Sequence, residues 1–182
     1  LSYNAKVRGS LDISKLPTAL HHGLNAAYAH VVHNRLCFQG AQMKPLISIS
    51  LNPFYYCNFS CSFCYLTTEQ LKDKTLLGVD KIGELIELVQ ERYEIEWVDL
   101  YGGELLLLPE SYLESLINCL TVKGVGGIGL NTNLSLLSSI VNDERVHVSV
   151  SYDFHVREQS ERVFENMGKL KNGFSVLLLA SP

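Results

Sequence analysis

Two hydrophobic periodicities alternate along most of the chain. Segments in which apolar and polar residues alternate, or which form short apolar runs, indicate β-strands, because successive strand side chains point to opposite faces. Segments with apolar residues three and four positions apart indicate helices. We predict strands at 46–52, 96–101, 127–133, 146–152 and 174–179, and helices at 80–93, 109–120, 135–141 and 160–170. Asp80 is expected to cap the first of these helices.

Strand and helix follow each other through short connections, which is typical of repeated βα units and a parallel sheet. A parallel sheet covered by helices on both faces would have nearly continuous apolar strands, whereas here one face of each strand is repeatedly polar. The sequence therefore predicts a curved α/β sheet with helices outside and a concave polar inner face, as in a full or partial (β/α) barrel. The predicted inner face carries Ser48, Ser50, Asn52, Asp99, Tyr101, Asn131, Asn133, His147, Ser149, Ser151 and Asp153.

The first part of the chain has a different pattern. Residues 16–36 have apolar positions with an approximate helical spacing, including Leu20 and Leu24, and Pro17 stands near the start, where helices accept proline. We expect residues 1–44 to form an N-terminal helical extension and residues 45–182 to form the barrel-like domain.

The composition of the chain excludes several classes of protein. The chain has 182 residues, of which 47% are hydrophobic and 19% charged, so it can bury a core. A net charge of −4 argues against a broad nucleic-acid surface, which needs a basic stripe. No apolar run approaches the roughly 20 residues that span a bilayer, so no membrane segment is expected.

Three of the five cysteines lie within eight positions, in the spacing CxxxCxxC at Cys57, Cys61 and Cys64. A secreted disulfide framework normally has an even number of cysteines at wider spacings, so clustered thiols favour metal ligation in a reducing compartment, with the cytoplasm as the default. Thiolates suit iron–sulfur clusters or zinc. A cubane cluster has four irons, so three cysteines leave one iron open for a small molecule.

The segment CNFSCSFCY resembles the signature loop of the radical S-adenosylmethionine (SAM) enzymes, CxxxCxΦC, in which Φ is aromatic. Phe63 occupies the aromatic position, and Tyr65 follows the last cysteine. The resemblance implies that Cys57, Cys61 and Cys64 ligate a [4Fe–4S] cluster and that Phe63 and Tyr65 lie at the cofactor site. Without the resemblance, two alternatives stay open: a zinc knuckle completed by a histidine elsewhere in the chain, or buried, unreactive cysteines.

A second motif, Gly102-Gly103-Glu104, follows the predicted strand 96–101. Consecutive glycines at a strand end let the backbone approach a ligand closely, and a carboxylate can accept a hydrogen bond from an ammonium group. The motif resembles the GGE motif of the same family. The resemblance implies that these three residues hold the amino group of the SAM methionine.

Polar residues also end the next two predicted strands, where barrel sites lie. The resemblance implies that they contact the SAM carboxylate and ribose, whereas simple capping of strand ends is the alternative. The segment SYDF resembles the family's SxDG but has phenylalanine in place of glycine. The residues concerned are Asn131, Asn133, Ser149, Ser151 and Asp153.

The resemblance implies a function. A reduced [4Fe–4S] cluster would cleave SAM into methionine and a 5′-deoxyadenosyl radical, which abstracts hydrogen from a substrate. The loop favours peptide, protein or small-molecule substrates without defining one. An external electron donor of the flavodoxin or ferredoxin type is implied. The alternative is a non-catalytic binding module that an iron–sulfur cluster or zinc stabilises.

Family barrels usually have six strands, and about five βα units are predicted here. We therefore expect a domain that is incomplete at its C-terminus. The last apolar strand would then be an exposed sheet edge, which a partner or a second copy of the chain would cover.

Overall fold

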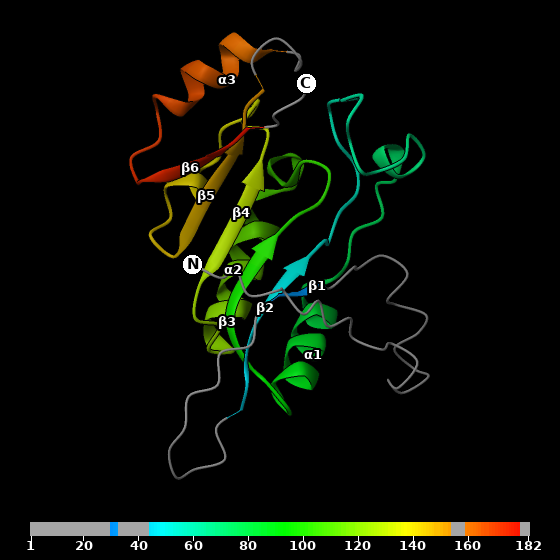
Figure 1. The fold of residues 1–182 in the computed structure, drawn as a ribbon, viewed down its shortest axis with the longest axis vertical. Coiled ribbons are helices and arrows are strands. Elements are labelled where there is room, and N and C mark those ends of the chain that lie inside the picture. Colours follow the sequence, from blue (N-terminus) through cyan, green and yellow to red (C-terminus); the bar gives the residue numbers. More distant parts are fainter. Residues whose placement is uncertain (1–29, 33–43, 154–158, 179–182) are drawn as a thin grey trace, which may run out of the picture.

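The computed structural model describes residues 30–32, 44–153 and 159–178. Within these ranges, six strands form one sheet in the order β1-β2-β3-β4-β5-β6 (Figure 1). The strands are β1 (His30–Val32), β2 (Leu46–Leu51), β3 (Glu94–Leu100), β4 (Ile128–Thr132), β5 (Val146–Ser151) and β6 (Phe174–Leu177). The α-helices are α1 (Val79–Gln90), α2 (Glu110–Val122) and α3 (Ser160–Met167), and the 3₁₀ turns are η4 (Gln70–Lys72), η5 (Leu105–Leu107) and η6 (Ser139–Asn142).

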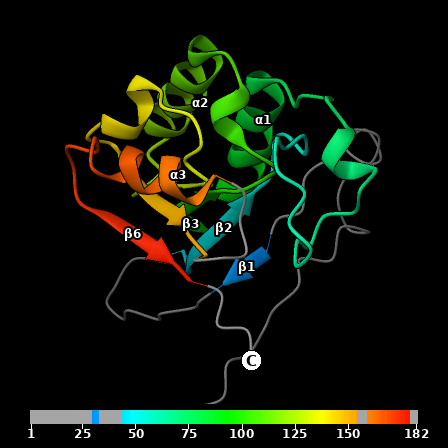
Figure 2. The ribbon, with the colours of Figure 1, turned by 90° about the horizontal axis from the view of Figure 1, so that it is seen from above.

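Strands β2 to β6 are parallel, and each pairs with the next strand along the chain. Helices α1, α2 and α3 all lie on one side of the sheet (Figure 2), as consecutive βα crossovers of one hand require. The predicted α/β partial barrel is therefore confirmed. No helix in the described ranges is long and apolar enough to cross a bilayer.

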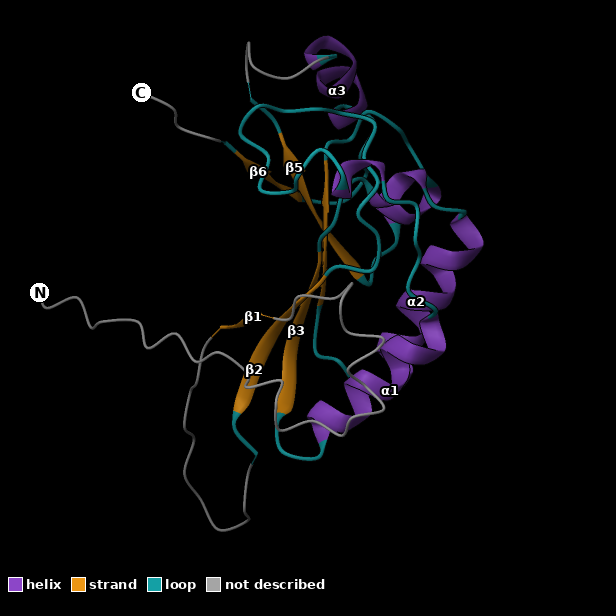
Figure 3. Ribbon diagram, turned by 90° about the vertical axis from the view of Figure 1, so that its right-hand side faces the viewer, coloured by secondary structure: helices purple, strands orange, loops and turns teal. Residues whose placement is uncertain are grey.

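The hydrophobic core lies between the helices and the apolar face of the sheet. Ile49 on β2, Val98 on β3 and Leu130 on β4 are almost completely buried there, and they pack in one cluster with Ile82 of α1 and Leu116 of α2. The sheet arches, with its concave side turned away from the helices (Figure 3). The burial of alternate strand residues thus confirms the predicted division into an apolar outer face and a polar inner face.

The predicted N-terminal helix is wrong at His30–Val32, which form β1 and pair antiparallel with β2. Valines at 31 and 32 are β-branched and favour an extended backbone, and the outer edge of β2 supplies free hydrogen-bonding groups. The rest of the predicted extension lies outside the described residues.

Two other local predictions are corrected. Helix α1 is capped by Gly78 rather than by Asp80, and it ends at Gln90, three residues before the predicted end at 93. The helix predicted at 135–141 is only the short turn η6, because Leu134 has a φ of 50° and directs the chain away from a helical path.

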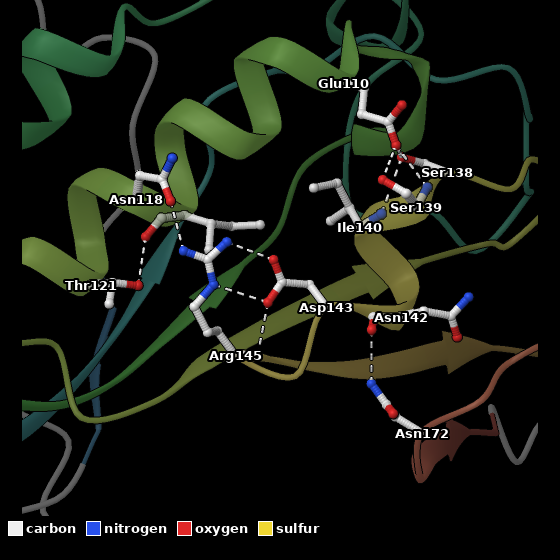
Figure 4. Close-up of polar contacts among 11 residues, drawn as sticks. Glu110, Asn118, Thr121, Ser138, Ser139, Ile140, Asn142, Asp143, Arg145 and Asn172 are labelled. Atoms are coloured by element: carbon white, nitrogen blue, oxygen red, sulfur yellow. Dashed lines mark hydrogen bonds and ion pairs between the residues drawn. The ribbon is translucent and has the colours of Figure 1, made fainter.

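Polar contacts hold η6 and the start of β5 against α2 (Figure 4). The Arg145 guanidinium donates to both carboxylate oxygens of Asp143, at 2.6 and 2.9 Å, and to Asn118 Oδ1 on α2 at 2.6 Å. Glu110, in the first turn of α2, accepts from the hydroxyls of Ser138 and Ser139. These contacts fix the connection that leaves the carboxyl end of β4.

Candidate functional site

The loop that carries the three cysteines begins just after β2 and runs beside the loop that follows β3. The Gly103 amide donates to the carbonyl oxygen of Phe54, and the Glu104 amide donates to that of Tyr56, both at 2.9 Å. A Cβ atom at 103 would lie 2.1 Å from the Tyr56 oxygen, and one at 102 would lie 2.3 Å from the Phe54 oxygen. Two adjacent glycines are therefore what lets the two loops pair through their backbones.

Cys57, Cys61 and Cys64 are among the residues that line one cavity of about 530 Å³. A tight turn between the last two cysteines is closed by a 3.0 Å bond from the Cys64 amide to the Cys61 carbonyl, and the Cys57 amide bonds the Leu71 carbonyl at 3.2 Å. Within the described ranges, no three His, Cys, Asp or Glu side chains converge to hold a single metal ion. Cysteine thiolates are the usual ligands of iron–sulfur clusters, and three of them around one cavity suit a four-iron cluster with one iron left without a protein ligand.

The electrostatic surroundings of Cys57 disfavour its thiolate. Burial is the main cause that raises the pKa of this thiol, and the charges of Glu104, Cys61 and Cys64 raise it further. The Phe59 amide, 3.4 Å from the sulfur, opposes the shift. The thiol is therefore neutral near pH 7 in the absence of metal, and a bound cation would reverse that balance because coordinated thiols are deprotonated.

The side chain of Glu104 is fully buried, and its carboxylate accepts hydrogen bonds from other groups of the protein. One carboxylate oxygen accepts from the Thr132 hydroxyl at 2.7 Å and from the Leu106 amide at 3.0 Å, and the other accepts from the Asn133 amide at 2.7 Å. Glu104 thus ties the loop after β3 to the end of β4.

The remaining predicted residues fall into two groups. Asn133 and Asp153 are buried, whereas Asn131, Ser149 and Ser151 are half-buried on the concave face near the carboxyl ends of β4 and β5. Asn131 and Ser149 are register partners on these strands.

The two aromatic residues of the cysteine loop differ in exposure. Phe63 is half-buried. Tyr65 is 69% exposed, and its hydroxyl lies 3.4 Å from the Gly102 carbonyl oxygen. Tyr65 therefore lies against the glycine pair.

Three residues of the site are absent from the sequence-based prediction. Asn58 Nδ2 donates to Ser135 Oγ at 2.9 Å, and Asn58 Oδ1 accepts from Asn133 Nδ2 at 3.1 Å. Thr132 donates to Glu104 from the helix-covered face of β4. The sequence could have indicated Thr132, because it is a polar residue at a position of the strand where the pattern predicts an apolar one. Nothing in the sequence pattern indicates Asn58 or Ser135.

The chain is similar to two curated proteins, both named "Probable GTP 3′,8-cyclase". The protein from Metallosphaera sedula is 29% identical over 113 residues, which cover 59% of this chain and 35% of the relative. The protein from Sulfurisphaera tokodaii is 34% identical over 102 residues, which cover 53% and 31%. The chain thus spans about a third of the length of the curated relatives it matches. No family model matches the chain.

Solved structures share the fold. The chain is similar to anSMEcpe with bound AdoMet, with a TM-score of 0.58 and 20% identity over 74% of this chain and 43% of that one. It is also similar to Streptococcus suis SuiB bound to the precursor peptide SuiA, with a TM-score of 0.52 and 15% identity over 69% and 31%. The fold and the loop with three cysteines define an α/β partial barrel with a candidate metal site after its first parallel strand. The relatives confirm the resemblance to the radical SAM family.

Proposed function

We propose that this chain forms the catalytic core of a radical SAM enzyme, with Cys57, Cys61 and Cys64 as the ligands of a [4Fe–4S] cluster. The observation that carries the proposal is that the three cysteines line one cavity, while the stem of their loop is hydrogen-bonded to the Gly102-Gly103-Glu104 segment. When bound, the reduced cluster supplies the electron that cleaves SAM into methionine and a 5′-deoxyadenosyl radical, which abstracts hydrogen from a substrate.

The loop after β3 is proposed to receive the methionyl end of SAM. The side chain of Glu104 is buried and accepts three hydrogen bonds from the protein, so its part is to hold the loop in place. The amino group of SAM would then donate hydrogen bonds to the backbone carbonyl groups beside the glycines. Tyr65, whose hydroxyl lies against the Gly102 carbonyl, would cover this end of the site.

The concave face is proposed to receive the rest of SAM. Asn131, Ser149 and Ser151 offer amide and hydroxyl groups near the carboxyl ends of two adjacent parallel strands, which is where barrel sites lie. Such groups can both donate and accept, as ribose hydroxyls and a carboxylate require. Asp153 is buried directly beyond β5 and is proposed to support that end of the site.

The proposed substrate is a peptide or a small molecule. Support for a peptide is the similarity to SuiB bound to its precursor peptide, and support for a small molecule is the name of the two curated relatives. The proposed electron donor is a small flavodoxin- or ferredoxin-type protein.

Anaerobic reconstitution with iron and sulfide tests the proposal. The chain should acquire a brown iron–sulfur chromophore and, with SAM and a strong reductant, release 5′-deoxyadenosine. Cys61→Ala should abolish both, whereas Cys119→Ala, a matched change on α2 outside the site, should retain both. Tight zinc binding, or a cluster that never yields 5′-deoxyadenosine, would instead identify a non-catalytic module.

A further inference from the structure

The buried side chain of Asn133 lies where the cysteine loop, the loop after β3 and the end of β4 meet. Its Nδ2 donates to Asn58 Oδ1 at 3.1 Å and lies 3.9 Å from Cys57 Sγ, within the range of an N–H···S hydrogen bond. Its Oδ1 accepts from the Ser135 amide at 2.9 Å, and its own amide donates to Glu104 at 2.7 Å. Asn133 is only 5% exposed.

A further bond closes this arrangement into a ring. Asn58, from the cysteine loop, donates to the hydroxyl of Ser135, which follows β4. We call Asn58, Asn133 and Ser135 the asparagine clasp. The side-chain Nδ2 of Asn133 carries two hydrogens and has two acceptors in the cysteine loop, Asn58 Oδ1 and Cys57 Sγ.

We propose that Asn133 is a positioning residue that fixes the first cysteine of the loop, Cys57, through the asparagine clasp and through its own N–H···S contact. This proposal rests on the proposed function, in which Cys57 is a ligand of the cluster. It gives Asn133 a role different from the SAM contact that the family resemblance implies.

The asparagine clasp connects Cys57 to the end of strand β4 through a short series of hydrogen bonds. The main-chain amide of Asn133 donates a hydrogen bond to the Glu104 carboxylate. The same carboxylate also accepts hydrogen bonds from the Thr132 hydroxyl and the Leu106 amide. The position of the sulfur is therefore set by strand β4 rather than by the loop alone. A hydrogen bond to a ligating sulfur also stabilises the more negatively charged, reduced form of a cluster, which raises its reduction potential.

Hydrogen exchange of the cluster-free protein tests the positioning role. Asn133→Ala and Asn58→Ala should each accelerate amide exchange in peptides covering residues 57–64 by about five-fold, the effect of losing about 1 kcal/mol of hydrogen bonding. Because both residues belong to one ring, the double variant should exchange little faster than Asn133→Ala alone. Asn118→Ala, a matched change on α2, should leave these peptides unchanged. Asn58 is exposed, so its variant remains informative if Asn133→Ala fails to fold.

The midpoint potential of the reconstituted cluster tests the contact with sulfur. Asn133→Ala should lower the potential, whereas Asn58→Ala, which leaves the Asn133 amide beside Cys57, should not. A merely structural role would shift both variants alike or neither. Unchanged exchange of the loop in both folded variants would overturn the proposal. If the wild-type chain takes up no cluster, the proposed function fails, yet the exchange experiment still decides whether the clasp orders the loop.

Discussion

The main-chain amide of Glu104 donates a 2.9 Å hydrogen bond to the carbonyl oxygen of Tyr56, the residue immediately before the first cysteine. Two motifs separated by about forty positions are therefore joined by their backbones. The consequence is that the loop after β3 acts on the cysteine loop directly, and that changes in one should be detected in the other.

Gly103→Ala should disturb the cysteine loop without touching a cysteine. The added Cβ would lie 2.1 Å from the Tyr56 carbonyl oxygen and 2.3 Å from that of Tyr55. We expect a loss of about 1–3 kcal/mol in the free energy of unfolding, as for other overpacked sites, together with reduced iron uptake. Gly173→Ala is the control, because its Cβ would have no neighbour within 4 Å. Equal stability and iron content in the two variants would contradict the account.

Glu104→Gln should destabilise the protein although the two side chains have nearly the same shape. Donors from Thr132, Leu106 and Asn133 surround the carboxylate, so an amide NH₂ group must face at least one of them. Breaking a buried hydrogen bond to a charged group costs about 1.5–3 kcal/mol. Urea denaturation measures this cost in the absence of SAM. A variant as stable as the wild type, but with weakened SAM binding, would show instead that Glu104 is a ligand.

Leu134 adopts a left-handed backbone conformation, with φ of 50°, although it is a fully buried leucine. Truncation to alanine or glycine should cost about 2–5 kcal/mol through lost packing. Glycine should be the less harmful of the two by up to about 1 kcal/mol, because it tolerates this conformation and alanine does not. At Leu130, in regular strand conformation on β4, the order of the same two substitutions should be the usual one, with alanine better. Denaturation midpoints of the four variants decide the point.

The hydrophobic pattern of the strands correctly predicted which face of the sheet is apolar, because this depends only on the order of residues within each strand. Alternation in 46–52 and 146–152 placed the apolar face of the sheet correctly, because side-chain direction in a strand follows from position alone. The asparagine clasp was not predictable, since Asn58 and Asn133 are 75 positions apart. The inward orientation of Glu104 was hidden for the same reason, because its partners on β4 are identified only by the three-dimensional structure.

Errors at the ends of elements have a similar origin. The helix predicted over 16–36 was an interpretation of spacing alone, and pairing of His30–Val32 with the edge of β2 overrides it at those residues. Asp80 is a residue typical of helix caps, but the chain already enters its helix at Gly78. Local propensity decides such boundaries only where tertiary contacts do not.

The stability of the protein should fall at high pH in part through Tyr112. Burial raises the pKa of Tyr112 to about 12 from an ordinary value of 10. Because the folded-state pKa is the higher one, this contribution to stability is complete below about pH 10 and is lost as the pH rises through 12. The hydroxyl also donates a 2.6 Å hydrogen bond to the Leu77 carbonyl.

Tyr112→Phe removes both effects. The variant should be about 1 kcal/mol less stable than the wild type at pH 8, where it lacks the hydrogen bond. The difference should shrink between pH 10 and 12, because only the wild type loses the contribution of the buried phenol. Free energies of unfolding at pH 8 and pH 11 test this prediction, which is incorrect if the difference is the same at both values.

We propose that three cysteines hold a cluster with one iron left open for SAM. Electron paramagnetic resonance of the reduced, reconstituted protein before and after the addition of SAM tests it most directly. We expect a cluster spectrum that changes on SAM binding and that is absent in Cys57→Ala. A cluster spectrum that SAM leaves unchanged, or a chain that holds zinc and gives no signal, would contradict it.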